Sequence, residues 1–281
     1  IVSDAINRAL GMVIDAQRDL PMARIWGVGN SASSDGQFFP TTRQGEAMNL
    51  INAKYGNEPG IKAYTHVSDQ FGPFATQKIP VTVNEAPFIL DGILTTDAGK
   101  KIKEQYADTG GFTDHTFALS SLLGFSFVPR IRDLSSKRLY VFDPVGTPKR
   151  LRGLIGGKVR ENLIREHWTD ILRIAATMET GDMQPSQIMR RLAAYPRQNT
   201  LAVALREIGR IERTLFIARW LTDSGLQRRA QIGLNKGEAH HALKNALRIG
   251  RQGEIRDRSS QAQEYRIAGL NLVTASIIYW H

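Results

Sequence analysis

Three carboxylates lie in sequence contexts that could support metal-dependent chemistry. Asp35 has small neighbours (Ser33-Ser34-Asp35-Gly36-Gln37) that leave room around its side chain. Asp108 ends an expected strand, where carboxylates project from a sheet edge into a crevice. Glu238 lies in an expected helix, at the edge of an apolar stripe formed by Ala239, Leu243, Ala246 and Leu247. Each also has an ordinary interpretation, as a turn aspartate, a capping aspartate or a solvated helix glutamate.

Other kinds of catalytic or cofactor site are poorly supported. The chain has no cysteine and therefore no disulfide or thiolate zinc site. Its six histidines form no H-E-x-x-H pattern, and no G-x-S-x-G or Walker lysine motif occurs. Residues 27–32 match a loose G-x-G-x-x-A pattern, but with an expected helix before and strand after, the reverse of a dinucleotide site. Oxygen-only ligation of Mg²⁺ or Mn²⁺ remains, and spacing does not exclude three rival carboxylates, Asp69, Asp114 and Asp133.

The charge balance favours a polyanionic partner. Thirty-seven Lys and Arg against 27 Asp and Glu give a net charge of +10, which attracts nucleic acid or an anionic membrane. Arg206, Arg210 and Arg213 follow helical spacing and share one face, as a phosphate-binding stripe would. Two alternatives stay open: a merely basic protein, and a stripe that pairs with Glu207 or Glu212.

The first 150 residues predict a mixture of helices and strands. Apolar spacing predicts a helix over 4–18, and Pro21 and Gly27 bound a second. Strands are expected over 31–39, 61–71 and 76–84, with a turn at Gly72-Pro73 between the last two. A helix over 86–94, a strand over 103–108, a helix over 113–123 capped by Thr113, and a strand over 125–131 follow.

From about residue 150 to 232 the pattern predicts helices only, over 159–179, 185–194 and 200–221, and a final helical segment begins at Lys236. The expected fold is therefore an α/β sheet interrupted by an all-helical insertion. The expected division is a helical lead-in (1–30), core strands and helices (31–149), the insertion (150–232) and C-terminal helices that complete the core (233–281).

No window has the ~18 consecutive apolar residues that a membrane-spanning helix needs, and no secretory signal opens the sequence. The run 268–280 is interrupted by polar residues and predicts a buried helix. These features favour the cytoplasm. The chain starts without Met and stops in an apolar run, so we expect a fragment of a longer protein.

The same segments resemble a known family, the transposases of class II replicative transposons (the Tn-three family). The resemblance runs across almost the whole chain and rests on residues 33–37, 64–70, 108–115, 129–134, 195–199, 201–214, 233–238 and 253–258.

The resemblance implies a ribonuclease-H-like mixed sheet, with the insertion between the fifth strand and the helix that carries the catalytic glutamate. It maps a DDE triad onto Asp35, Asp108 and Glu238, which would hold two Mg²⁺ ions (Mn²⁺ may substitute). Such an enzyme cleaves the 3′ ends of a transposon and joins them to target DNA, and in the family the products are cointegrates.

DNA is the implied partner, as terminal inverted repeats and target, with a dimer on DNA and an association with the bacterial nucleoid. We expect phosphate contacts from Arg130, Arg132, Arg197, Lys236 and the Arg206, Arg210 and Arg213 stripe. Two other functions stay open: a nuclease of the same fold that only hydrolyses, and an inactive DNA-binding module.

Overall fold

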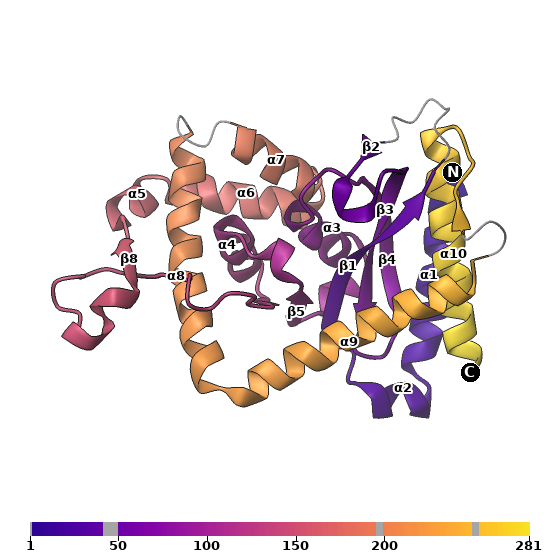
Figure 1. The fold of residues 1–281 in the computed structure, drawn as a ribbon, viewed down its shortest axis with the longest axis horizontal. Helices are drawn as coiled ribbons and strands as arrows, with labels where there is room; N and C mark the ends of the chain where they lie inside the picture. The colour runs from indigo at the N-terminus through magenta and orange to yellow at the C-terminus, as the bar shows by residue number, and fades with distance from the viewer. Residues whose placement is uncertain (1, 42–49, 195–198, 249–252) are drawn as a thin grey trace. The chain divides into compact units, whose positions relative to one another are not determined.

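The computed structural model describes residues 2–41, 50–194, 199–248 and 253–281 (Figure 1). The chain divides into two compact units. Unit 1 comprises residues 1–85, 95–102 and 233–281, and unit 2 comprises residues 86–94 and 103–232. No helix of the described residues is long and apolar enough to cross a membrane.

Unit 1 is built on antiparallel strands. The long strand β3 pairs with β1, with β4 and with the short β2, and Asp35 stands opposite Thr65 in the register of β1 and β3. Around the strands are helices from both ends of the chain. The elements are α1 (Val2–Arg18), α2 (Pro21–Trp26), β1 (Ser31–Pro40), β2 (Leu50–Ile51), β3 (Pro59–Ser68), β4 (Pro73–Pro80) and α10 (Ser260–Trp280).

The core of unit 1 joins the two ends of the chain. Leu10 and Ile14 of α1 pack with Phe74 of β4 and Ala275 of α10 in one apolar cluster. A second cluster gathers β1, β3 and α10 around Phe39, Ile61 and Ile267. Burial of these side chains holds β1 in place, and β1 carries Asp35.

Unit 2 combines a parallel strand pair with a group of helices. β5 (Glu104–Ala107) pairs with β6 (Ser126–Pro129), and Ala107 is opposite Pro129. Its helices share one apolar core, to which Leu90, Leu119, Ile171, Leu192 and Leu205 contribute. The helices are α3 (Ile89–Thr95), α4 (Asp114–Leu122), α5 (Glu161–Glu166), α6 (Trp168–Thr180), α7 (Pro185–Ala194) and α8 (Thr200–Thr222).

Several helices begin where a side chain accepts a hydrogen bond from the first turn, as the cap preferences of Ser, Thr and Asn require. Thr113 accepts from the backbone N of Thr116 at the start of α4, which confirms the predicted cap. Asn199 does the same for α8 and Ser259 for α10. Glycine at residue 209 lets α8 lie directly on α4, since a Cβ there would be 1.8 Å from the carbonyl oxygen of Asp114.

Most predicted elements are confirmed, with shifted ends. The predicted hairpin is present, but its turn spans residues 69–72, so β4 starts at Pro73 and ends earlier than expected. The predicted helix over 86–94 opens as a 3-10 turn (Ala86–Phe88) before α3. The predicted helix over 159–179 is broken at His167 into α5 and α6.

The prediction of an all-helical insertion is wrong at its start. β8 (Ile155–Lys158) lies inside it and pairs in parallel with β7 (Leu139–Val141), after a 3-10 helix (Lys149–Leu154). Adjacent glycines disfavour a helix, and the strand itself depends on a close approach to β7. A Cβ at Gly156 would lie 2.6 Å from Cβ of Arg138, so only glycine permits this approach.

The final helical segment also begins earlier than predicted. α9 (Ser224–Ala246) starts twelve residues before Lys236, after Asp223, whose Oδ1 accepts a hydrogen bond from the backbone N of Leu226. Glycines at 225, 233 and 237 are unfavourable inside a helix, so the sequence pattern did not predict a helix over its first half.

Candidate active site

A polar layer joins β1 to α9 around Asp35. Because side chains alternate along a strand, Ser33, Asp35 and Gln37 point to one face of β1. α9 meets all three. A Cβ at Gly237 would lie 3.1 Å from Oγ of Ser33, and Nδ1 of His241 lies 3.8 Å from Oδ2 of Asp35.

Gln37 connects β1 to the C-terminal part of α9. Its Nε2 donates hydrogen bonds to Oδ1 of Asn245 at 2.7 Å and to the carbonyl oxygen of His241 at 3.3 Å. The helix therefore follows the strand over two turns. Since Glu238 directly follows Gly237, these contacts fix the segment that carries Glu238 beside the strand that carries Asp35.

Asp35 keeps a third of its side chain exposed, at 33%, and its Oδ1 accepts a hydrogen bond from the backbone N of Gly36 at 2.7 Å. Burial, followed by the charges of Lys244 and Arg248, lowers the pKa of the neighbouring His241 to about 4. His241 is thus neutral at pH 7, and its contact with Asp35 is not an ion pair there.

Behind this layer lies a buried lysine. The Nζ of Lys244 donates a hydrogen bond to Oγ1 of Thr65 at 2.9 Å, and Thr65 in turn bonds Oγ1 of Thr76 at 3.0 Å. Lys244 is almost fully buried, and burial lowers its pKa from 10.5 to about 7. Burial also lowers the pKa of His240 well below its ordinary value, with smaller contributions from Lys244 and His241.

The predicted packing face of this helix is wrong. Ala239 and Ala246 are exposed, and Leu243 and Leu247 are only half-buried. The helix instead buries a polar face, made of Gly233, Gly237, His240, His241 and Lys244. Glu238 is exposed.

Asp108 lies in unit 2, directly after β5. Its backbone carbonyl accepts from N of Gly111 and its Oδ1 from Oγ1 of Thr109, so it begins a short 3-10 turn, and its side chain is exposed. Arg130 follows β6 at the same end of the parallel pair, since Ala107 is opposite Pro129 and N of Arg130 donates to the carbonyl oxygen of Ala107. An exposed carboxylate and an exposed arginine thus leave adjacent strands at one edge, and Arg132 is exposed two residues further on.

The triad residues are divided between the units: Asp35 and Glu238 belong to unit 1, and Asp108 to unit 2. In the described ranges, no three histidine, aspartate or glutamate side chains are gathered as a ready metal site. The convergence of all three residues therefore stays a prediction.

The rival carboxylates have structural partners. Oδ1 of Asp69 accepts from N of Gly29 and ties the loop that leads into β1. Asp133 accepts from Ser135 and Ser136 in a surface turn. Asp114 pairs with Arg213 at 2.7 Å, although its burial raises its pKa more than the nearby arginines lower it.

The predicted phosphate-binding residues have different surroundings. Nζ of Lys236 donates to the carbonyl oxygens of Trp26 and Asp69, so its ammonium is held inside unit 1. Arg210 pairs with Glu207, as the alternative interpretation of the stripe held, and both Arg210 and Arg213 stack over the ring of Tyr140. Arg197 lies outside the described residues.

Sequence reasoning missed Gln37, Asn245 and Lys244 as parts of this site. A signal was present, since His240, His241 and Lys244 lie three and four residues apart and mark a single polar face. The loose glycine motif at 27–32 is preceded by α2 and runs into β1, so the expected order of a helix followed by a strand is confirmed.

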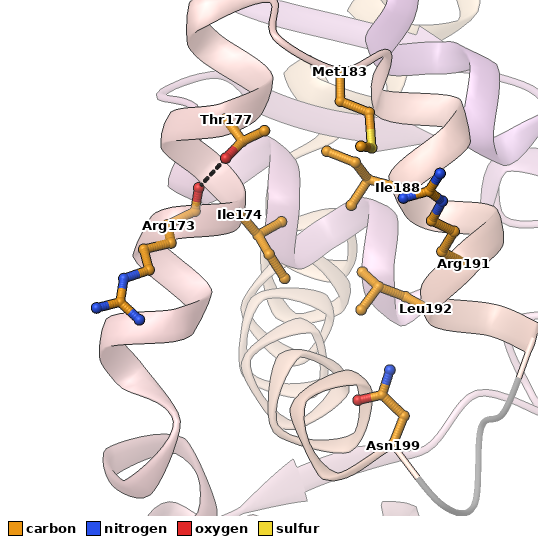
Figure 2. A pocket seen from close by; sticks show the side chains of 8 residues that line it. All are labelled: Arg173, Ile174, Thr177, Met183, Ile188, Arg191, Leu192 and Asn199. Atoms are coloured by element: carbon orange, nitrogen blue, oxygen red, sulfur yellow. Dashed lines mark hydrogen bonds between the residues drawn. The ribbon is translucent and has the colours of Figure 1, made fainter.

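A separate cavity of about 300 Å³ lies between α6 and α7 in unit 2 (Figure 2). Its floor is apolar, with Ile174 facing Ile188 and Leu192, and Arg173 and Arg191 extend from its rim. The described residues that line it include no carboxylate.

The fold and the site define a mixed α/β domain that presents carboxylates from a strand, a strand end and a helix. A family model, the Tn3 transposase DDE domain, matches residues 1–281, and the chain belongs to that family.

Its relatives are transposases of bacterial transposons. The chain is 50% identical to the transposase for transposon Tn501 of Pseudomonas aeruginosa over 100% of its length. It is 47% identical to that for Tn21 of Escherichia coli over 99%, and 31% identical to that for transposon gamma-delta of Escherichia coli strain K12, also over 99%. The chain spans 28% of the length of each of these relatives.

Proposed function

We propose that this chain is the catalytic part of a DNA transposase that cleaves the 3′ ends of a transposon and joins them to target DNA. One observation carries the proposal. In a member of the DDE family, the contacts of Gly237, His241 and Asn245 bring the Glu238 segment of α9 beside Asp35 on β1.

The donor set fits a divalent metal. Carboxylate oxygens are the ligands that Mg²⁺ and Mn²⁺ prefer, and all three proposed ligands, Asp35, Asp108 and Glu238, reach solvent. They would hold two ions, which when bound supply an activated water and stabilise the leaving oxygen. His241, neutral at pH 7, leaves the charge of Asp35 available for this role.

The proposed reaction has two steps. Water attacks the phosphodiester at each transposon end and breaks its P–O3′ bond, which frees a 3′-hydroxyl. That hydroxyl then attacks a target phosphodiester, forms a new P–O bond and displaces the target's own 3′ oxygen. Arg130 and Arg132, exposed beside Asp108, would bind phosphates and orient the strand.

We further propose that the fold is ribonuclease-H-like. Three long strands (β1, β3 and β4, with the two-residue β2 between the first two) are followed along the chain by α3, β5, α4 and β6, before the insertion and α9, and this order supports the assignment. Terminal inverted repeats and target DNA are the proposed substrates. A dimer on DNA, in the cytoplasm at the nucleoid, is the proposed working form.

The test is cleavage and strand transfer by the protein with Asp35→Asn, Asp108→Asn or Glu238→Gln, together with Mn²⁺ binding. Each change should abolish both reactions, weaken Mn²⁺ binding and preserve DNA binding. The matched controls Asp97→Asn and Glu179→Gln alter exposed carboxylates outside the site and should leave all three properties intact.

Unchanged activity in a triad variant would remove that residue from the site. Assays with intact and with precleaved transposon ends distinguish a transposase from the two alternative functions. Hydrolysis without joining would indicate a nuclease, and binding without nicking in Mg²⁺ or Mn²⁺ would indicate an inactive DNA-binding module.

A further inference from the structure

Half of the chain's net charge lies in one short segment of unit 2. Residues 134–158, defined here as the basic arm, hold six Lys and Arg against one Asp, a net charge of +5 out of +10 in less than a tenth of the sequence. The arm comprises β7, the 3-10 helix Lys149–Leu154 and β8. In Figure 1 the chain before β8 extends on the side of α8 away from α4.

The arm has no core of its own. None of its residues is buried, and several of its apolar side chains are exposed, among them Phe142 at 51% and Val145 at 81%. An exposed segment with both positive charge and apolar side chains is expected to contact a partner.

The arm is nevertheless firmly attached to α8. The backbone N of Tyr140 donates to Oγ1 of Thr214, and the ring of Tyr140 is covered by Arg210 at 4.3 Å and Arg213 at 5.3 Å. At the other end Val159 is buried, and Arg160 makes hydrogen bonds to the buried carboxylate of Glu207. The contacts of Tyr140 and Arg160 thus attach both ends of the basic arm to α8, and the part between them is exposed.

The middle has a defined shape. Arg152 donates from Nη2 to the carbonyl oxygen of Val145 and from Nε to that of Thr147, and Asp143 accepts from the backbone N of Val145. The arm's one acidic side chain is therefore used in its own turn. Lys149, Arg150 and Lys158 are exposed, and no ion pair involves them among the residues that the structure describes.

We propose that the basic arm is a binding surface for duplex DNA, with Lys149, Arg150 and Lys158 on backbone phosphates and Val145 against the sugar–base surface of a groove. This inference rests on the proposed function, which supplies the polyanion. Cations that are not ion-paired within the protein gain by displacing the counterions of DNA, and apolar side chains inserted in a groove are a known mode of DNA binding.

The test is the salt dependence of binding to a fluorescent duplex of about 30 base pairs, measured by anisotropy in EDTA so that no cleavage occurs. The triple variant Lys149→Gln, Arg150→Gln and Lys158→Gln should make the negative slope of log K against log salt shallower by about 2–3, since each phosphate contact contributes about −0.9. Val145→Ser should weaken binding several-fold and leave the slope unchanged.

A matched triple variant controls for net charge. Arg8→Gln, Arg24→Gln and Lys101→Gln remove three exposed charges from unit 1 and should change the slope by less than about 1. Equal slopes for the two triple variants would overturn the proposal. So would an arm triple variant that keeps its DNA affinity but loses cosedimentation with vesicles containing about 30% phosphatidylserine, because the arm would then bind membranes.

The experiment separates the two levels of inference. A wild-type protein that binds no DNA would contradict the proposed function itself. Wild-type binding with an unchanged slope in the arm triple variant would contradict the assignment of the arm alone.

Discussion

Replacing Lys244 with methionine should stabilise the protein at neutral pH. Lys244 is almost fully buried, its ammonium donates a hydrogen bond to the neutral hydroxyl of Thr65, and the neighbouring His240 and His241 are neutral. Methionine has a stem of similar length and carries no charge, so Lys244→Met keeps the packing and removes the desolvation cost.

The magnitude follows from the pKa. Burial lowers the pKa of Lys244 from 10.5 to about 7, and each unit corresponds to about 1.36 kcal/mol, so the charge costs on the order of 5 kcal/mol when fully present. The unfolded lysine binds more protons between pH 7 and 10.5, so this cost is complete below pH 7 and disappears as pH rises through that window. With about 1 kcal/mol subtracted for the lost hydrogen bond, the expected gain at pH 7 is about 3–4 kcal/mol.

Urea unfolding at several pH values between 6 and 10.5 checks this. The wild-type free energy of unfolding should rise with pH across the window, and that of Lys244→Met should be flatter. The histidines contribute to this slope only below about pH 7.5, because the pKa of His241 is about 4 in the folded protein and an unfolded histidine has a pKa of about 6.5. Lys101→Met, at an exposed site, should change stability by about 0.5 kcal/mol or less. A Lys244→Met protein that is less stable than the wild type at pH 7, or that keeps the same pH slope, would refute the reasoning.

Two further substitutions probe unit 2. Gly209→Ala should lower the free energy of unfolding by about 3 kcal/mol or more. The reason is that the new Cβ would lie 1.8 Å from the carbonyl oxygen of Asp114, so α8 would have to move off α4. A loss of less than about 1 kcal/mol in denaturant unfolding would contradict that packing. Glu207→Gln should lower the free energy of unfolding by about 2–3 kcal/mol, because the buried carboxylate accepts hydrogen bonds from Arg160 and Arg210. The loss is limited because Arg160 is half-exposed and regains contact with water. A thermal midpoint equal to that of the wild type would argue against a structural role for these hydrogen bonds.

Local signals in the sequence were sufficient for much of the fold. The cap at Thr113 and the proline at the start of α7 each act within a few residues, so capping and proline placement identify these helix starts. β8 could not be found in this way, because a strand of four residues with two glycines depends on its approach to Arg138 and β7.

The candidate site was predictable in its residue types and less so in its packing. Asp35 and Glu238 were selected by context and resemblance, and their role as ligands stays a prediction, but the face of α9 was assigned to the wrong side. An apolar stripe is normally the buried one, and here Gly237 and Lys244 are buried because they fit against the polar residues Ser33 and Thr65. Only the tertiary contact reveals that preference.

The most direct test of the central claim uses the absence of cysteine from the sequence. Asp35→Cys, Asp108→Cys and Glu238→Cys each introduce a single thiolate, which binds Mg²⁺ poorly and softer ions better. If the three carboxylates are metal ligands, each variant should be inactive in DNA cleavage with Mg²⁺ and regain measurable cleavage with Mn²⁺. Full activity in Mg²⁺, or no recovery in Mn²⁺ from a folded variant that binds DNA, would contradict metal ligation at that position.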